Sequence, residues 1–281
     1  MISLSESAID ALLAEDCPYM DMTVEALGMG NATGQLKCHP KADCVLAGAD
    51  TAARLLQRAG CHVALEAADG ARLGAGQVFL RAKGAARALH KGWKIAQNVL
   101  EYACGIATRT AHMLEVARRE APHVHVAATR KNFPGAKGLS IAAVLAGGGS
   151  VHRLGLSDSL LVFEQHRVFM GGMEGFVRHL PAIRRAFPER RLCAEVDTAD
   201  DALALARAGI DSIQCERFSP EDLAVAVRGI KAVAPQVLVL AAGGINADNA
   251  AAYARAGADV LVSSWMYFGR PQDIKVRITP L

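Results

Sequence analysis

The sequence lacks the features of a secreted or membrane-spanning protein. Its seven cysteines are widely spaced, odd in number and contain no Cys-x-x-Cys pair, which favours reduced thiols over a disulfide framework. The first 16 residues, MISLSESAIDALLAED, contain no basic segment followed by a long apolar one, so we expect no signal peptide. No run approaches the ~20 apolar residues of a membrane span. We therefore expect a cytoplasmic protein without a membrane partner.

An excess of charge of one sign is also missing. The 281 residues carry a formal net charge of +3, which is too small to predict a nucleic-acid partner. The 26 glycines and 10 prolines are spread along the chain, so no long low-complexity linker is expected. Hydrophobic residues make up 52% and charged residues 21%, a composition typical of a globular protein of one large domain or two linked ones.

The pattern of residues 1–84 predicts a small α+β unit. Short extended runs, such as GQLKCHP and GQVFLRAKG, surround one helical segment, DTAARLLQRAG, which ends on Gly60 as helices often do. A long helical region follows over residues 85–119. It contains Gly92 and Gly105, and we expect these glycines to kink or split it.

From about residue 122 the pattern changes to strands that alternate with helices. The last four apolar runs recur every ~20–26 residues, the spacing of βα units in a parallel sheet. Six runs fit such strands: HVHVAA, SLLVF, LCAEV, SIQCE, QVLVLAA and DVLVSS. A regular barrel of this type has about eight strands. We therefore expect a short or open barrel, or one with a strand that leaves no recognisable run.

Charged side chains and a glycine pair follow the predicted strands. Parallel α/β barrels carry their active sites at the C-terminal ends of the strands. At these ends the chain has two cations, Arg130 and Lys131, and two carboxylates, Glu195 and Glu216. The pair Gly243–Gly244 lies between a strand and a helix, where backbone amides can approach a phosphate. We therefore expect cations, carboxylates and a phosphate-binding turn at one mouth.

These residues also have structural explanations. One alternative is that Arg130 and Lys131 are only a solvent-exposed pair at the end of a strand. Another is that His152 makes only structural hydrogen bonds. Gly243–Gly244 alternatively serves only as a tight turn. Asp197 is expected to cap the helix that begins in VDTADD rather than to act chemically.

Five separated motifs together resemble one known family. ATRKNFPGAKG, GGGSVHRLGLSDSLLVFEQH, AEVDT, CERF and AAGGI fall in the order and spacing of the quinolinate phosphoribosyltransferases, also called nicotinate-nucleotide pyrophosphorylases (carboxylating). The resemblance covers nearly the whole chain, including CGIATRT in the long helical region. It implies an α/β protein with an N-terminal α/β sandwich domain and an open, incomplete parallel α/β barrel of about seven strands.

The resemblance also implies a division of the chain and an assembly. The sandwich with its long helical region is expected over residues 1–108 and the catalytic barrel over 109–270, with 271–281 as a tail that packs back on the N-terminal domain. A homodimer, or a multiple of dimers, is expected, with active sites that use both subunits. Lys94 lies in the segment where the family donates a cation to the neighbouring barrel.

The family reaction joins a ring nitrogen to the ribose of phosphoribosyl pyrophosphate and releases pyrophosphate. The resemblance implies catalytic roles for Glu195, Lys131 and Glu216. Glu195 matches a carboxylate near the ribose, and Lys131 matches a phosphate-binding lysine. Glu195 and Glu216 would also hold Mg²⁺ through the pyrophosphate. No tightly bound organic cofactor is expected.

The remaining implied roles concern the two substrates. On the acceptor side, Arg130 matches an arginine that grips a carboxylate through its planar fork, and His152 and Arg153 match a His-Arg pair. On the donor side, Gly243–Gly244 match the turn that binds the 5′-phosphate, and Ser263 is expected to bind phosphate with them.

Five departures from the family pattern limit this inference. Phe163, which we expect in the acceptor site, replaces a lysine, and Trp93–Lys94 replaces Glu-Arg. Ala242 replaces a serine, Arg217 replaces an asparagine, and Glu216 stands where aspartate is usual. The changes fall mainly on the acceptor side. In this they resemble the ModD branch of the family, which is associated with molybdenum transport operons.

Three functional hypotheses remain. The first is phosphoribosyl transfer to a nitrogen heteroaromatic acceptor other than quinolinate, with a link to molybdenum metabolism. The second is a true nicotinate-nucleotide pyrophosphorylase of NAD biosynthesis. The third is a non-catalytic protein that binds phosphate ligands, against which the retained catalytic residues argue.

Overall fold

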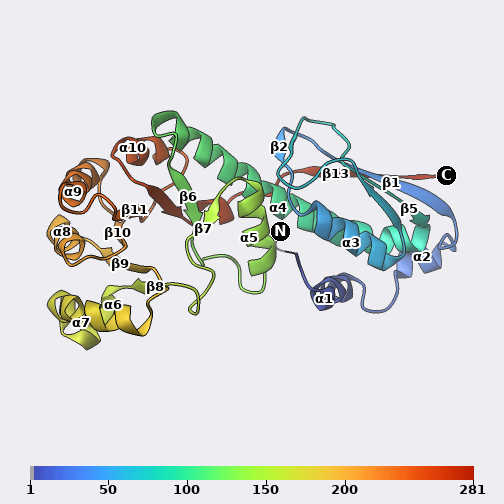
Figure 1. The fold of residues 1–281 in the computed structure, drawn as a ribbon. Helices are drawn as coiled ribbons and strands as arrows, with labels where there is room; N and C mark the ends of the chain where they lie inside the picture. Colours follow the sequence, from blue (N-terminus) through green and yellow to red (C-terminus); the bar gives the residue numbers. More distant parts are fainter. Residues whose placement is uncertain (1–2) are drawn as a thin grey trace. The chain divides into compact units, whose positions relative to one another are not determined.

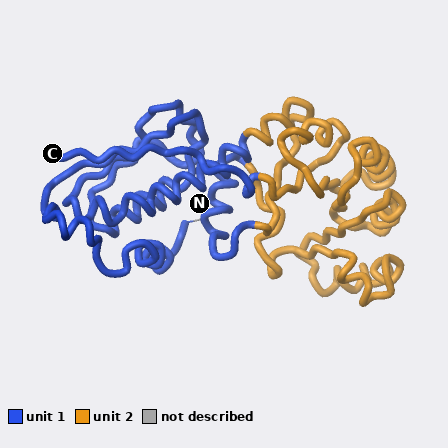
Figure 2. Tube along the Cα trace, turned by 180° about the vertical axis from the view of Figure 1, so that it is seen from behind, with its two compact units in different colours: residues 1–111, 132–148, 266–281 blue, residues 112–131, 149–265 orange. Residues whose placement is uncertain are grey.

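The computed structural model describes residues 3–281 as an α/β protein, and the chain divides into two compact units (Figure 2). The first unit comprises Met1–Ala111, Asn132–Gly148 and Met266–Leu281, and the second comprises His112–Lys131 and Gly149–Trp265. Within residues 3–281, no helix combines the length and apolarity needed to cross a membrane.

The first unit is built on an antiparallel sheet of order β13-β1-β5-β3 (Figure 1). Its strands are β1 (Thr33–Pro40), β3 (His62–Leu65), β5 (Leu80–Ala85) and β13 (Ile274–Pro280). Gly34 pairs with Pro280 and Pro40 with Ile274, so the end of the chain completes the N-terminal sheet. A small ladder joins β2 (Cys44–Val45) to β4 (Arg72–Leu73).

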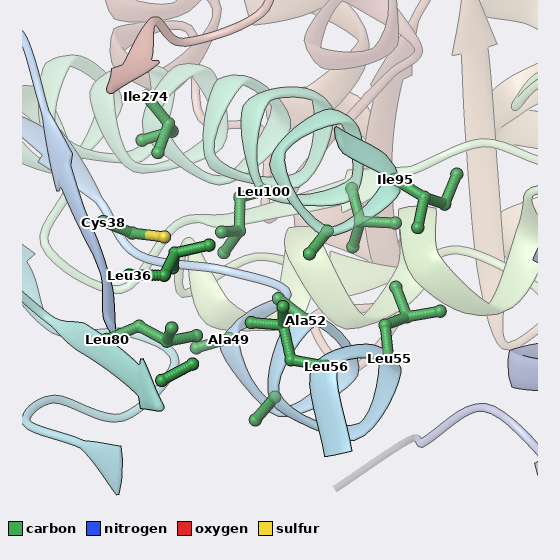
Figure 3. Close-up of a cluster of buried hydrophobic side chains, with 14 of the residues drawn as sticks. Leu36, Cys38, Ala49, Ala52, Leu55, Leu56, Leu80, Ile95, Leu100 and Ile274 are labelled. Carbon is green, nitrogen blue, oxygen red and sulfur yellow. The ribbon is translucent and has the colours of Figure 1, made fainter. Parts of the chain in front are cut away.

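Helices pack on this sheet through an apolar core. They are α1 (Glu6–Asp16), α3 (Ala49–Ala59), the first part of α4 (Ala86–Glu120) and α5 (Lys137–Ala146), while the short α2 (Met22–Ala26) precedes β1 in the chain. Leu36 of β1 and Leu80 of β5 meet Leu56 of α3 and Leu100 of α4, all fully or almost fully buried (Figure 3). Burying such leucines contributes roughly 1.5–3 kcal/mol each.

Of the expected effects of the two glycines, a kink or a split, the split was wrong, because α4 is one continuous helix of 35 residues. A Cβ at Gly92 would lie 3.1 Å from Leu56 Cδ2, and a Cβ at Gly105 would lie 3.1 Å from the Arg270 carbonyl oxygen. Glycine in a helix costs about 1 kcal/mol relative to alanine. Other segments of the same protein lie too close to these positions for a larger residue, which explains why the helix contains glycine despite its lower helix propensity.

The second unit contains a seven-stranded parallel sheet of order β7-β6-β12-β11-β10-β9-β8. The strands are β6 (His125–Ala128), β7 (Ser150–Val151), β8 (Leu160–Val162), β9 (Leu192–Val196), β10 (Ser212–Glu216), β11 (Leu238–Ala242) and β12 (Val260–Ser263). β7 and β8 are the edge strands, so the sheet forms an open barrel. The expected fold class is confirmed. The strand that left no apolar run is β7, which has only two residues.

Helices follow most of these strands, as the alternating pattern predicts. They are α6 (Glu164–Arg167), α7 (Gly172–Ala186), α8 (Ala199–Arg207), α9 (Pro220–Val233) and α10 (Ala250–Arg255), with short 3₁₀ turns at Val168–Met170 and Trp265–Tyr267. The cap of α8 is Thr198, whose side chain accepts a hydrogen bond from the Asp201 N–H. The expectation that Asp197 caps this helix was wrong, since the chain enters the helix one residue later.

Candidate active site

A cavity of about 480 Å³ opens at the C-terminal ends of the barrel strands. Every residue that lines it belongs to the second unit, and all seven strands contribute at or just beyond their last residues. Side chains reach this position because parallel strands bring all their carboxyl ends to one edge. The cavity therefore collects residues that are far apart in the sequence.

Four basic residues come from the ends of β6 and β7. The Lys131 N–H donates to Thr129 Oγ1 (3.1 Å), which holds the turn after β6. Arg153 is only 6% exposed, and within residues 3–281 its Nε has no hydrogen-bond partner. Burial, followed by the charge of Arg130, lowers the pKa of Arg153. A buried guanidinium with a free donor, beside a second arginine, suits an anionic ligand.

His152 stands beside this pair in the same wall. Its backbone N–H donates to the Ala128 carbonyl (3.0 Å), which continues the pairing of β7 with β6 one residue beyond β7. Burial and the charge of Arg153 lower the pKa of the His152 imidazole. At neutral pH the ring is therefore uncharged, able to donate one hydrogen bond and accept another.

The carboxylates come from β9 and β10. Glu195 Oε2 accepts a hydrogen bond from Gln214 Nε2 (2.7 Å), its partner across the two parallel strands. Arg167 donates to the Glu195 backbone carbonyl (2.5 Å), so both ends of this residue are held. Burial, and then the charge of Glu216, raise the pKa of Glu195, while Gln214, Arg167 and Lys131 lower it. Two carboxylates share one cavity, a charge arrangement that suits a cation or a positively charged reaction centre.

Phe163 closes one side of the cavity at the end of β8. Its ring stacks on His166, with centroids 5.7 Å apart and planes 22° apart, and the Phe163 N–H donates to His166 Nδ1 (3.0 Å). It packs against an apolar cluster that includes Leu161, Ala242 and Val262, all of which line the cavity. The wall that follows β8 is therefore aromatic and apolar rather than cationic.

A turn at the end of β11 presents backbone N–H groups to the cavity. Gly243 and Gly244 have φ values of 90° and 78°, the left-handed region that favours glycine. Within residues 3–281, neither amide N–H donates a hydrogen bond. A Cβ at Gly243 would lie 2.6 Å from Arg217 Cγ and 2.9 Å from Glu216 Oε1, so only glycine fits. Successive free amides in such a turn form an anion-binding concavity.

Ser263 supports this turn from β12. Its hydroxyl donates to the Ile245 carbonyl (2.5 Å) and accepts from the Trp265 N–H (3.0 Å), and the residue is buried. Two hydrogen bonds within the chain therefore occupy this side chain, although it lines the cavity.

The structure gathers ten of the eleven predicted site residues around this cavity. They are Arg130, Lys131, His152, Arg153, Phe163, Glu195, Glu216, Gly243, Gly244 and Ser263. Lys94 is the exception. It lies on α4 in the first unit, where its Nζ is 5.4 Å from the Trp93 ring centroid and donates to Gln97 Oε1 (3.1 Å).

Sequence reasoning missed Gln214, which lines the cavity and binds Glu195. The signal was present in SIQCE. Gln214 and Glu216 are two residues apart in a strand, so both side chains point to the same face. A polar residue within an otherwise apolar strand, on the face of a predicted catalytic carboxylate, marks the site.

Comparison with known proteins shows the family of this chain. The models of the quinolinate phosphoribosyl transferase N-terminal and C-terminal domains match residues 21–104 and 106–277. The chain belongs to the quinolinate phosphoribosyltransferase family. Members of this family are pentosyltransferases, and the chain is an enzyme of this class.

The relatives fall into two named groups. A protein of Escherichia coli O6:H1 named "Putative pyrophosphorylase ModD" is 36% identical over 280 residues, covering 100% of this chain and 99% of the relative. Its Rhodobacter capsulatus namesake is 39% identical over 92% of this chain and 98% of the relative. A nicotinate-nucleotide pyrophosphorylase (carboxylating) of Mycobacterium leprae is 33% identical over 92% of this chain and 90% of the relative.

Solved structures share the fold. NadC from Streptococcus pyogenes superposes with a TM-score of 0.90 at 24% identity, with 100% of both chains covered. The nicotinate-nucleotide pyrophosphorylase of Francisella tularensis gives a TM-score of 0.89 at 21% identity, covering 99% of this chain and 98% of that one.

Proposed function

We propose that the protein transfers phosphoribose from phosphoribosyl pyrophosphate to a nitrogen heteroaromatic acceptor other than quinolinate, with release of pyrophosphate. The observation that carries the proposal is the composition of one cavity. Two carboxylates, a lysine and a glycine turn suit the donor, whereas the acceptor wall combines two arginines with the aromatic ring of Phe163.

Each step of the transfer has a residue in this cavity. The acceptor nitrogen forms a bond to C1′ of the ribose, and the C1′–O bond to pyrophosphate breaks, with its electron pair leaving on the pyrophosphate. Positive charge develops on the ribose during this exchange. The Glu195 carboxylate, held by Gln214, stabilises that charge by its field. Lys131 offsets the negative charge of the phosphates.

Magnesium fits the cavity as a companion of the donor. Within residues 3–281, no three His, Cys or acidic side chains gather into a metal site of their own. Mg²⁺ is commonly held by one or two carboxylates together with substrate phosphates, and Glu195 and Glu216 would supply them. The repulsion from Glu216 that raises the pKa of Glu195 supports a cation there. Bound Mg²⁺ would neutralise charge on the leaving pyrophosphate.

The glycine turn is assigned to the 5′-phosphate of the donor. The free amides of Gly243 and Gly244 provide hydrogen-bond donors without a side chain in the way. Ser263 holds the turn through the Ile245 carbonyl.

The acceptor is expected to be flat and to carry a single carboxylate. Arg130 and Arg153 bind that carboxylate, and neutral His152 adds a hydrogen bond. Phe163 stacks on the ring, an interaction worth roughly 0.5–1.5 kcal/mol. A second carboxylate beside Phe163 would lose its water without gaining a cation.

Two alternatives are decided by the same assay of pyrophosphate release. The first is a quinolinate enzyme of NAD biosynthesis, which the similarity to nicotinate-nucleotide pyrophosphorylases supports. The second is a protein that binds phosphate ligands without catalysis. The similarity over the full chain to proteins named ModD supports the first proposal over both.

The resemblance to the ModD branch extends the proposal to molybdenum metabolism. A strain that lacks this protein should then grow more poorly than its parent when molybdate is limiting and equally well when molybdate is abundant. Equal growth under both conditions would remove this link and leave the transfer reaction untouched.

The reaction itself is tested by pyrophosphate release from phosphoribosyl pyrophosphate with Mg²⁺ and a panel of heteroaromatic acids. We expect release with at least one monocarboxylate and little with quinolinate. Calorimetry should show donor binding that Lys131→Ala weakens by about 10- to 150-fold, since a charged hydrogen bond contributes roughly 1.5–3 kcal/mol. Release with no acid of the panel, or equal donor affinity in the variant, would contradict the proposal.

A further inference from the structure

Arg217 has an unusual backbone for its residue type. Its φ of 57° makes it the only residue other than glycine with a positive φ in residues 3–281. This left-handed conformation is disfavoured for side chains with a Cβ and is adopted most easily by glycine and asparagine. An arginine here is therefore strained, and such strain is concentrated at functional sites.

The contacts of Arg217 within the chain do not explain why it is an arginine. Its N–H donates to the Ala242 carbonyl (2.8 Å), which extends the pairing of β10 with β11, but any residue except proline can make this bond. Its side chain is 84% exposed, and its Nε lies 3.8 Å from Glu216 Oε1. An exposed ion pair at that distance contributes little to stability.

The side chain lies over the glycine turn of the active site. Arg217 Cγ is 2.6 Å from the position that a Cβ at Gly243 would occupy. Arg217 is thus in close contact with Gly243, the first residue of the turn, whose amide N–H donates no hydrogen bond within residues 3–281. Its neighbour Glu216 lines the cavity, while Arg217 lines a second pocket together with Asp197.

We propose that Arg217 binds the 5′-phosphate of the phosphoribosyl donor together with the amides of the glycine turn. The inference rests on the proposed function for the identity of the donor. Amides supply directed but neutral donors, and the planar guanidinium adds charge and two parallel hydrogen bonds to phosphate oxygens. The exposed side chain can turn from Glu216 to a bound phosphate, and the strained backbone keeps it over the turn.

The test is calorimetry with two separate probes, ribose 5-phosphate and inorganic pyrophosphate, each with Mg²⁺. Arg217→Asn removes the cation but tolerates the left-handed backbone, so it should unfold at a temperature no lower than wild type. It should bind ribose 5-phosphate about tenfold more weakly, about 1.4 kcal/mol, and pyrophosphate within about twofold of wild type. Arg217→Gly provides a second variant with the same expected losses.

Arg178→Asn is the matched control. Arg178 is an exposed arginine of α7 in the same unit, 3.7 Å from Glu174, and its loss changes the net charge equally. It should bind both probes as wild type does. Unchanged ribose 5-phosphate affinity in Arg217→Asn, a loss confined to pyrophosphate, or an equal loss in Arg178→Asn would each overturn the role of Arg217. Wild type that binds neither probe would instead overturn the proposed function, and this role with it.

Discussion

Phe163 is the residue on which the substrate assignment depends. Quinolinate carries two carboxylates, and Arg130 and Arg153 offer cations for one anionic group. At the end of β8, the aromatic ring of Phe163, which packs on Leu161 and His166, cannot donate a hydrogen bond to the second carboxylate. An unpaired carboxylate oxygen beside it would be desolvated without compensation. We therefore expect Phe163 to select against a dicarboxylate more strongly than it selects for any particular ring.

His152 gives the site a pH-dependent contribution to stability. Because burial lowers its folded-state pKa, the unfolded chain takes up the proton first as pH falls. The free energy of unfolding should therefore decrease as pH drops through the ordinary histidine range toward the lowered value. Urea titrations at pH 7 and pH 5 measure this change. The free energy of unfolding should decrease less from pH 7 to pH 5 in His152→Gln than in wild type.

The exposed His123 offers a control for that measurement, since His123→Gln should lose as much stability as wild type over the same interval. An identical loss in wild type and His152→Gln would show that the buried imidazole does not contribute.

At the scale of helices and strands, the sequence predicted the elements that show a hydrophobic pattern. Apolar runs located β6 and β8 to β12, and the order of the strands placed most of the site residues at one edge. β7 was missed because two residues cannot show a period, although its edge position carries His152 and Arg153. The intact α4 was missed because the reason for its glycines is close packing with segments distant in sequence.

The turn after β11 permits a sharp test of an element. Gly243→Ala should lower the free energy of unfolding by roughly 2–5 kcal/mol, because it adds overpacking of about 1–3 kcal/mol to the ~1–2 kcal/mol strain of a positive φ. Gly244→Ala has the same kind of backbone but no atom within 4 Å of the new Cβ, so it should cost only the strain, roughly 1–2 kcal/mol. Urea titration of both variants measures the difference, and equal losses would contradict the close approach at Gly243.

At the scale of the whole molecule, the predicted site residues fall in both units. Lys94 belongs to the first unit, and every residue that lines the cavity belongs to the second. The family resemblance implies a homodimer, or a multiple of dimers, in which this cation serves the partner's cavity. We keep that assembly as a prediction.

Mixing two inactive variants tests the assembly. Lys94→Ala and Glu195→Ala subunits should each lose activity, and their mixture should regain part of it, up to about a quarter of the wild-type rate. Statistical exchange makes half of the dimers hybrid, and each hybrid holds one intact site of two. Rates should be measured after mass spectrometry has confirmed subunit exchange. No recovery under those conditions would show that Lys94 does not complete the partner's site.

The central claim is that this site does not use quinolinate efficiently, and steady-state kinetics with quinolinate test it most directly. Wild type should show a kcat/KM well below the ordinary enzyme range of ~10⁴ M⁻¹s⁻¹ or more. Phe163→Lys should raise it by about 10- to 150-fold, since it restores one charged hydrogen bond of roughly 1.5–3 kcal/mol. Efficient turnover of quinolinate by wild type, with no gain in Phe163→Lys, would contradict the claim and identify a quinolinate enzyme.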